Sequence, residues 1–380
     1  MRKSLFKKMS AAILSLTLVV GMTAAVPAAV KTGTDISNGV KWQGFSIHTR
    51  EDKGEWEDAL KKAGQVYNNQ KDAFKSYGEN AKISSQTSTN VTMNVTSTGY
   101  SANWKPDGTV AQSNPWGVTL NKILKIEKGR TYTISFKIKS TLQNEIKETK
   151  TRKDGTGYNV GTGKMNYVKH IHLKAYRNHE KDGDPAIKFN SIKATYKGAS
   201  VLSKTKDYSN FIKLDSRNDD YVDVIASVTV PGDNLAYKQN TMGVMLAMGA
   251  FLKEFPNEND MKGVVDVKDF KVVAGSAALK ANKVSKVKPN AKKGTMKVSL
   301  KKVKGAKGYE VQYFTSYNKS EKTYSGKKTV KAKKATVTIK NKKKIKAKKT
   351  LYVRARYYKT VNGKKTYSVW SALKKVKIKK

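Results

Sequence analysis

The chain contains no cysteine among its 380 residues. Disulfide bonds, a thiolate nucleophile, cysteine-ligated metal and a lipid-modified cysteine are therefore excluded. Catalytic signatures are also missing, because no G-x-S-x-G, no H-E-x-x-H and no phosphate-binding glycine loop occurs. Acidic residues such as Asp182, Asp184, Glu258 and Asp260 stand in polar sequences typical of solvated loops. We therefore expect a protein without enzymatic activity.

Acidic residues are scarce, since 76 Lys and Arg oppose 29 Asp and Glu, giving a formal net charge of +47. Such a charge attracts polyanions, including nucleic acids, anionic membranes and acidic glycopolymers. The imbalance is greatest from Lys280 onward, with 35 basic residues against Glu310 and Glu321. This change of composition follows a sequence of small residues at Gly275, where we expect a domain boundary and a linker over 276–283.

The N-terminus lacks a long unbroken apolar run. Its basic start, MRKSLFKK, is followed by an apolar stretch that Gly21 and Pro27 interrupt, and small residues from Ala25 to Ala29 offer cleavage positions. A membrane helix needs about 20 apolar residues, so the pattern predicts a secretory signal peptide over 1–29. The mature protein is then secreted, extracellular or cell-wall associated, with no membrane span and no nucleic acid as physiological partner.

Alternation of apolar and polar residues is the main structural signal in the middle of the chain. In TYTISFKIKS (131–140), Tyr132 and Phe136 share one face with two isoleucines. Several such segments, joined by turn-rich connections, predict an all-β fold built as a two-sheet antiparallel sandwich. Helical spacing occurs in 55–75 and predicts a short helical insertion.

The middle region resembles the carbohydrate-binding modules of families 4 and 9, which are jelly rolls. The resemblance is carried, within about 81–275, by NPWGVTLNKILKIEKGRTYTISFKIKS (114–140), SVTVPGD (227–233) and the segment 244–273. It implies that residues 30–275 form a jelly-roll β-sandwich that binds poly- or oligosaccharide. It also implies a structural calcium ion, with Asp269 and Asp266 as candidate ligands, although Lys268 stands beside Asp269 in place of a second acid.

The C-terminal part, about 284–378, predicts a second and smaller β-sandwich, with Asn362 and Gly363 marking a hairpin turn. The sequences VKGAKGYEVQYFTS, TVTIKN and LYVRARYYKTVNGKKTYSVWS resemble a Lys-rich bacterial fibronectin type III domain. In that resemblance Tyr352 takes the tyrosine-corner position, and Leu300 stands where many such domains have a core tryptophan. It implies a spacer or adhesion module, running to the C-terminus, without catalytic residues.

Sugar binding needs flat aromatic faces flanked by polar side chains. Tyr100 and Trp104 stand in GYSANWKPDG, and Trp116 follows in NPWGVTL. These three are candidate carbohydrate contacts, with core packing as the alternative for Trp116. We expect Trp42 and Trp56 to pack in the core or in the insertion.

The sequence HIHLKAY places His170, His172, Lys174 and Tyr176 on one face of a strand, because side chains alternate. Three interpretations stay open: a plain polar sheet face, a sugar-binding face contacted through the two histidines and Tyr176, or a metal site, for which a third ligand is not evident. We expect the long polar segment 141–167 to be a loop beside this face.

Together these patterns favour a secreted carbohydrate-binding protein. Its aromatic-lined jelly-roll face binds poly- or oligosaccharide, and its basic C-terminal domain holds it on anionic cell-wall polymers. The alternative is a cell-surface adhesin or structural protein without sugar binding, and a third possibility is an accessory module of a glycoside hydrolase system. An aromatic-lined cleft over His170 and His172 favours the first, and a flat polar face favours the second.

Overall fold

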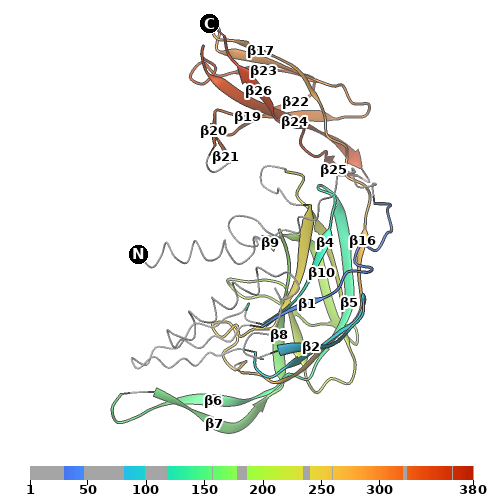
Figure 1. Cartoon of the computed structure of the whole chain (residues 1–380), viewed down its shortest axis with the longest axis vertical. Coiled ribbons are helices and arrows are strands. Elements are labelled where there is room, and N and C mark those ends of the chain that lie inside the picture. The colour runs from blue at the N-terminus through green and yellow to red at the C-terminus, as the bar shows by residue number, and fades with distance from the viewer. Residues whose placement is uncertain are drawn as a thin grey trace. The chain divides into compact units, whose positions relative to one another are not determined.

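The structure is a computed structural model that describes residues 30–46, 81–98, 116, 118–155, 157–177, 186–233, 240–258, 260–319, 323–361 and 363–379. Within these ranges every element of regular secondary structure is a β-strand, so the described chain is all-β (Figure 1). No helix in the described ranges is long and apolar enough to cross a membrane. The signal peptide expected at 1–29 and the helical insertion expected at 55–75 lie outside them.

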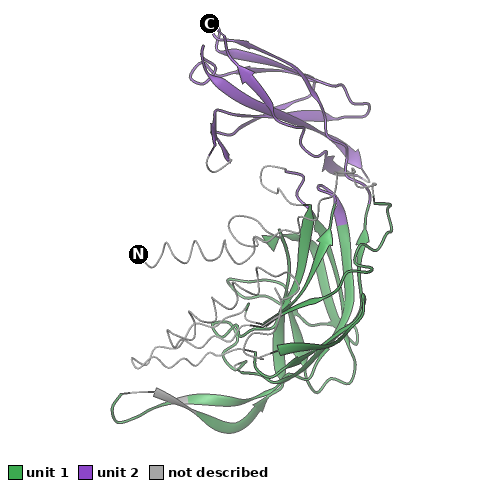
Figure 2. Cartoon of the chain, viewed as in Figure 1, with its two compact units in different colours: residues 1–126, 132–229, 239–275 green, residues 127–131, 230–238, 276–380 purple. Residues whose placement is uncertain are grey.

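The chain divides into two compact units (Figure 2). The first unit contains residues 1–126, 132–229 and 239–275, and the second contains 127–131, 230–238 and 276–380. The final boundary between the two units along the chain lies between Gly275 and Ser276, shortly before the lysine-rich part of the sequence begins.

Two seven-stranded sheets form the main body of the first unit (Figure 1). The first, named here the site sheet, has the order β1 (Gln43–Ser46), β4 (Val118–Lys125), β15 (Thr241–Ala247), β8 (Val168–Arg177), β13 (Phe211–Asp215) and β12 (Leu202–Ser203), with β9 (Ala186–Ile187) paired to β8. The second, named the back sheet, has the order β11 (Ala199–Ser200), β10 (Phe189–Tyr196), β14 (Val222–Thr229), β5 (Thr131–Ser140), β16 (Gly263–Ala274), β3 (Val91–Val95) and β2 (Ala81–Gln86). The chain passes repeatedly from one sheet to the other, so neighbouring strands are distant in sequence.

The buried faces of the strands follow the alternation in the sequence. In β5 the side chains of Tyr132, Ile134, Phe136 and Ile138 are at most 3% exposed, while the residues between them are half-buried or exposed. Fully burying a side chain of this size contributes roughly 1.5–3 kcal/mol. The predicted all-β sandwich is therefore confirmed, and its stability comes from burial in a chain that has no disulfides.

A lysine lies inside this sandwich. Lys122 of β4 is fully buried, and its Nζ donates to the main-chain carbonyls of Ser37, at 3.3 Å, and of Ser88. The ammonium lies 5.1 Å from the ring centroid of Trp42 and 5.2 Å from that of Phe270. Burial lowers the pKa of Lys122 to about 8. Trp42 packs in the core, as the sequence predicted, and helps to hold this cation.

The segment 141–167, expected to be a loop, instead contains a β-hairpin, so that expectation was wrong. β6 (Asn144–Thr151) pairs with β7 (Gly157–Asn166). At the base of the hairpin, the side-chain amides of its first and last residues each donate to the carbonyl of Asn257 at 3.0 Å. Hydrophobic periodicity did not reveal the hairpin because its strands carry few apolar residues.

The second unit is a smaller pair of sheets. One has the order β17 (Val284–Asn290), β18 (Thr295–Leu300) and β23 (Thr336–Lys340). The other has the order β22 (Lys328–Ala332), β19 (Gly308–Phe314), β24 (Thr350–Val361) and β25 (Lys364–Tyr367), with β26 (Lys374–Lys377) paired to β24. A short hairpin of β20 (Ser316–Asn318) and β21 (Thr323–Ser325) follows β19. Leu300, which stands where the resemblance has a core tryptophan, lies in the core between these sheets.

The sequence YSVWS, residues 367–371, attaches the end of this unit to β24. Its last serine accepts a hydrogen bond through its hydroxyl from the main-chain N–H of Ala355, at 2.9 Å. Its Trp370 is buried, and the guanidinium groups of Arg354 and Arg356 lie 4.6 and 4.5 Å from the ring centroid. A cation over an aromatic face contributes about 0.5–2 kcal/mol, so this stack fixes both arginines on β24.

Tyr352 does not occupy the core corner that the resemblance gave it. Along β24, Leu351 and Val353 are buried, whereas Tyr352 is half-buried on the opposite face. Its ring meets those of Tyr324 and Tyr317, with centroids 5.0 and 5.9 Å apart. Strand alternation places Leu351, and not Tyr352, on the inner face, so the assignment of Tyr352 to the tyrosine corner was wrong.

Candidate functional site

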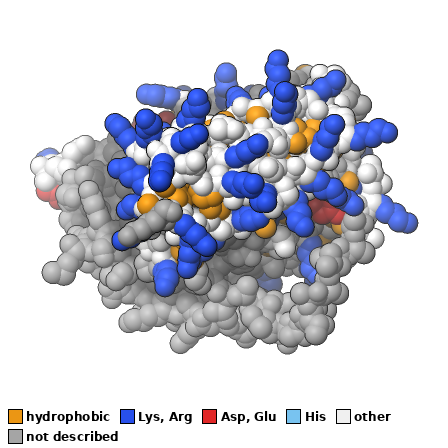
Figure 3. All heavy atoms as spheres, turned by 90° about the horizontal axis from the view of Figure 1, so that it is seen from above, with side chains coloured by type: hydrophobic (Ala, Val, Ile, Leu, Met, Phe, Trp, Pro, Cys, Tyr) orange, Lys and Arg blue, Asp and Glu red, His pale blue; other side chains and the backbone are white. Residues whose placement is uncertain are grey.

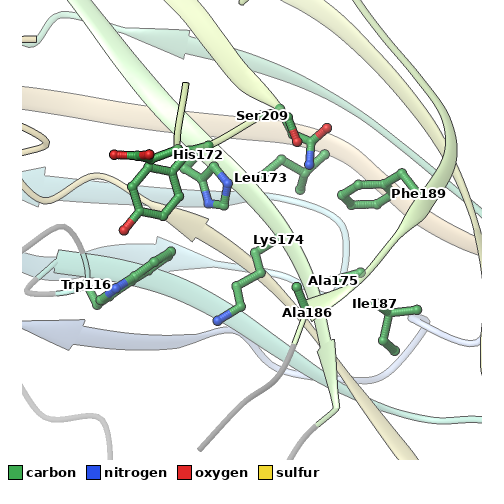
Figure 4. A pocket seen from close by; sticks show the side chains of 12 residues that line it. Trp116, His172, Leu173, Lys174, Ala175, Ala186, Ile187, Phe189 and Ser209 are labelled. Carbon is green, nitrogen blue, oxygen red and sulfur yellow. The ribbon is translucent and has the colours of Figure 1, made fainter. Parts of the chain in front are cut away.

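An open hollow of about 500 Å³ lies beside β8 in the first unit (Figure 4). It forms where β8 changes its neighbour, because β8 pairs with β13 as far as His172 and with β9 from Ala175. Trp116, Phe189 and the segment 207–210 complete the lining. The hollow is therefore lined by aromatic and polar side chains from segments far apart in the sequence.

Trp116 forms one side of the hollow (Figure 4). Its half-buried ring meets the rings of His172, Phe251 and Tyr208 edge to face, with centroids 5.5, 5.7 and 6.4 Å apart. The Nζ atom of Lys174 lies 4.7 Å from the Trp116 ring centroid. Trp116 thus packs against the aromatic core and lines the hollow at the same time.

His172 lies beside Trp116 and is buried. Burial lowers the pKa of His172 to about 4, the charge of Lys174 adds to this effect, and the backbone of Ser209 opposes it. The imidazole is therefore neutral near pH 7. Its Nδ1 atom is buried without a hydrogen-bond partner in the part of the chain that the structure describes. Buried polar atoms of this kind are generally satisfied by a water or by a ligand.

A short turn places Tyr208 next to His172. The N–H of Tyr208 donates to the hydroxyl of Thr205 at 3.0 Å, and the N–H of Thr205 donates to the Tyr208 carbonyl at 2.7 Å. Asp207 forms an ion pair with Lys253 at 2.6 Å. The ring centroids of Tyr208 and His172 are then 5.9 Å apart. Main-chain and side-chain bonds within the turn therefore give this aromatic wall its position.

Tyr176 lies on the same face of β8 as His172, and a glycine makes room for it. Gly243 of β15 is its cross-strand partner, and a Cβ atom there would lie 1.9 Å from Cζ of the tyrosine ring. The Tyr176 hydroxyl donates to Oδ1 of Asn121 at 3.2 Å. The Nζ atom of Lys174 lies 5.7 Å from the Tyr176 ring centroid. Tyr176 is buried and supports Lys174 from beside the hollow.

His170 is held by the loop that follows β15. Its ring stacks on Phe255, with centroids 3.8 Å apart, and its Nδ1 lies 2.5 Å from Oε1 of Glu258. The buried Glu258 carboxylate also accepts from the N–H of His170 at 3.0 Å and pairs with Nζ of Lys169 at 3.1 Å. Burial lowers the pKa of Lys169, and the charge of Glu258 opposes that shift. The expectation of a solvated Glu258 was wrong, since this carboxylate fastens the loop to β8.

The predicted sugar contacts do not all meet at the hollow. Trp116 and His172 line it, while His170 and Tyr176 share the sheet face without lining it. Tyr100 and Trp104 lie outside the described residues.

Sequence reasoning missed the turn at 207–210, which contributes Tyr208 and Asn210 to the lining. A signal was present, because KDYSN sets an aromatic residue among turn-forming polar residues. The same kind of pattern had pointed to Trp104.

Asp266 and Asp269, the predicted calcium ligands, do not fit a calcium site. Both carboxylate oxygens of Asp266 accept hydrogen bonds, Oδ1 from Thr92 at 2.8 Å and Oδ2 from Tyr221. Asp269 lies in an irregularity of β16, with its side chain 67% exposed. Calcium takes about six to eight oxygen ligands, whereas no three His, Asp or Glu side chains in the described ranges gather to hold a metal ion. The two histidines of β8 therefore have no third metal ligand there either.

No protein-family model and no curated protein matches the chain. Among solved structures, it is similar to one described as "CBM4 structure and function", with 13% identity, 62% of this chain and 88% of that chain covered, and a TM-score of 0.30. It is also similar to the adhesin domain of Epf from Streptococcus pyogenes, with 14% identity, 92% and 98% covered, and a TM-score of 0.29. The fn3 domain of human contactin 1 matches with 12% identity, 28% and 89% covered, and a TM-score of 0.18. These TM-scores are below 0.5, so none of the three similarities assigns a function to the chain.

Proposed function

We propose that this protein is a secreted, non-catalytic carbohydrate-binding protein. Its first unit is a jelly-roll carbohydrate-binding module, and the hollow beside β8 binds a poly- or oligosaccharide. Its second unit is a fibronectin type III-like module whose positive charge holds the protein on anionic polymers of the cell wall.

The arrangement of aromatic and polar groups around the hollow carries this proposal. Trp116 and Tyr208 offer ring surfaces for the C–H groups of a sugar, and Lys174 and Asn210 offer donors for its hydroxyls. The volume of about 500 Å³ is within the range of about 300–1,000 Å³ typical of small-ligand sites. A flat polar face would instead favour an adhesin without sugar binding.

The lack of catalysis is part of the proposal. Glycoside hydrolysis needs two carboxyl groups facing each other across the substrate, roughly 5–10 Å apart. Among the described lining residues the carboxylate is Asp207, which pairs with Lys253 at 2.6 Å, and the described lining offers no second carboxyl group to face it. The Asp207 carboxylate is placed to accept hydrogen bonds from sugar hydroxyls.

A glycan array probed with the full mature chain tests the first unit. Trp116→Ala is expected to weaken binding at least about tenfold, while Tyr196→Ala on the back sheet serves as the matched control and leaves binding unchanged. Thermal melts of both variants separate loss of binding from loss of folding. Absence of binding to every neutral and acidic glycan by the folded wild-type chain would overturn the proposal and leave the adhesin as the better account.

Binding to isolated cell-wall fragments tests the second unit. Binding through lysine charge falls steeply as salt is raised, because bound counterions are released from the polymer. Full retention at about 1 M salt, where the Debye length is about 3 Å, would contradict a role for charge.

A further inference from the structure

Three tyrosines form a cluster on the second unit. Tyr317 of β20 and Tyr324 of β21 are cross-strand partners with ring centroids 4.6 Å apart. Both rings lie against Tyr352 of β24, and the buried Phe314 supports Tyr324 at 5.7 Å. Tyr317 is 36% exposed and belongs to the few large hydrophobic side chains that are exposed in the described ranges. The hairpin therefore presents an aromatic surface to solvent.

The hydroxyl groups separate this cluster from three other tyrosines of the same unit. The hydroxyls of Tyr309, Tyr313 and Tyr367 each make a hydrogen bond, at 3.1, 2.9 and 3.2 Å. Those of the three clustered tyrosines make none within the part of the chain that the structure describes. The cluster thus combines ring faces, which can pack against the C–H groups of a sugar, with hydroxyls that can hydrogen-bond to its hydroxyl groups.

The surroundings of the cluster are basic. Lys375 and Lys377 of β26 are exposed and stand opposite Tyr352 and Thr350 on the same sheet face. On the face of the molecule seen in Figure 3, Lys and Arg side chains are numerous and acidic side chains are few. A polymer that lies on the tyrosines therefore meets lysines beside them.

We infer that the tyrosine cluster is a stacking platform for an acidic polysaccharide built of sugar rings, such as a polyuronate. Pyranose rings lie on the faces of Tyr317 and Tyr352, and the acid groups pair with lysines such as Lys375. This inference rests on the proposed role of the second unit in holding anionic polymers, and it names their class. A polyol phosphate offers charge without rings, so charge alone attracts it and the platform gives it no advantage.

The ring geometry provides single open faces and no slot. The planes of Tyr317 and Tyr324 are tilted by 35°, and those of Tyr324 and Tyr352 by 74°. Rings at these angles do not hold a flat base from both sides, so a base gains only the single-face stacking that a pyranose also gains. An acidic polysaccharide matches both the positive charge and the open ring faces and is the occupant that we infer, and nucleic acid is an outcome of the test.

Binding of the full chain to polygalacturonate, polyglycerol phosphate and single-stranded DNA, whose bases are free to stack, at one moderate salt concentration, tests the inference. Tyr317→Ala and Tyr352→Ala are expected to weaken polygalacturonate binding about fivefold each and to leave polyglycerol phosphate binding unchanged. Tyr317→Phe keeps the ring and is expected to retain most of the binding. Tyr196→Ala is the control, and melting temperatures verify folding.

The outcomes are distinguishable. Equal affinity of every tyrosine variant for polygalacturonate, or an equal loss for all three polymers, would overturn the platform while leaving retention by charge intact. A loss confined to DNA would overturn it in favour of nucleic acid. Failure of the wild-type chain to bind any of the three polymers would contradict the proposed role of the second unit itself.

Discussion

The ring of Tyr176 lies against the main chain of Gly243 on the neighbouring strand, in space that a Cβ atom would occupy at 1.9 Å from Cζ. From this position the tyrosine hydroxyl reaches Asn121 at 3.2 Å. The Nζ atom of Lys174 lies above, 5.7 Å from the tyrosine ring and 4.7 Å from that of Trp116. A missing side chain on β15 therefore helps to set the polar wall of the hollow on β8.

Gly243→Ala is predicted to displace the Tyr176 ring. The added methyl overpacks a buried contact, which destabilises a protein by about 1–3 kcal/mol, and we expect glycan binding to weaken as well. Denaturant unfolding and the glycan array measure the two effects. The double variant Gly243→Ala/Tyr176→Ala removes the clash, so the alanine at 243 is expected to add little to the effect of Tyr176→Ala. Wild-type stability of Gly243→Ala alone would contradict the prediction.

His172 makes stability depend on pH. Its pKa is about 4 in the folded chain and about 6.5 in an unfolded one, so the unfolded state binds more protons between these values. Its contribution to stability is fully present above pH 6.5 and is lost as pH falls through 4, up to about 3 kcal/mol. His172→Phe keeps an aromatic ring and is expected to flatten this part of the pH profile. Unfolding free energies of the wild-type chain and of His172→Phe at several pH values decide the matter, and an unchanged slope in His172→Phe speaks against the prediction.

Lys122 is predicted to make the free energy of unfolding depend on pH in the alkaline range. Burial lowers its pKa to about 8 in the folded chain, against about 10.4 in an unfolded one. The contribution of this shift is present above about pH 10.4 and is lost as pH falls through 8, so the unfolding free energy rises between these values. Lys122→Met has no titrating group and is expected to lack this rise, whereas the exposed Lys82→Met retains it. Identical pH profiles for the two variants would exclude the buried amine as the cause.

Glu258→Gln is predicted to loosen the loop that carries Phe255. Removing one partner of a buried ion pair leaves the other charge uncompensated, which destabilises by about 3–5 kcal/mol. Here the stranded charge is that of Lys169. We expect Lys169→Met to recover much of the stability in the double variant. Denaturant unfolding measures this coupling, and purely additive effects of the two substitutions are the result that would count against it.

Local rules explain how much of the fold could be predicted. Strand β5 was predictable because apolar and polar residues alternate along its consecutive positions. The face that carries Tyr132 and Phe136 packs in the core. The hairpin of β6 and β7 was not, because it has little apolar surface. Tyr352 was misplaced by one position where a resemblance took precedence over the alternation of Leu351 and Val353.

By itself, the sequence determined the strands in which apolar and polar residues alternate, the two-part division of charge and the shared face of His170, His172 and Tyr176, because these depend on residue type and short-range periodicity. Only the tertiary structure decided which of these side chains meet. Trp116, Tyr208 and His172 come together because β8 exchanges β13 for β9 at this point, and Glu258 is buried because its loop folds back on Lys169. Contacts between segments far apart in the chain depend on strand order, which no local pattern specifies.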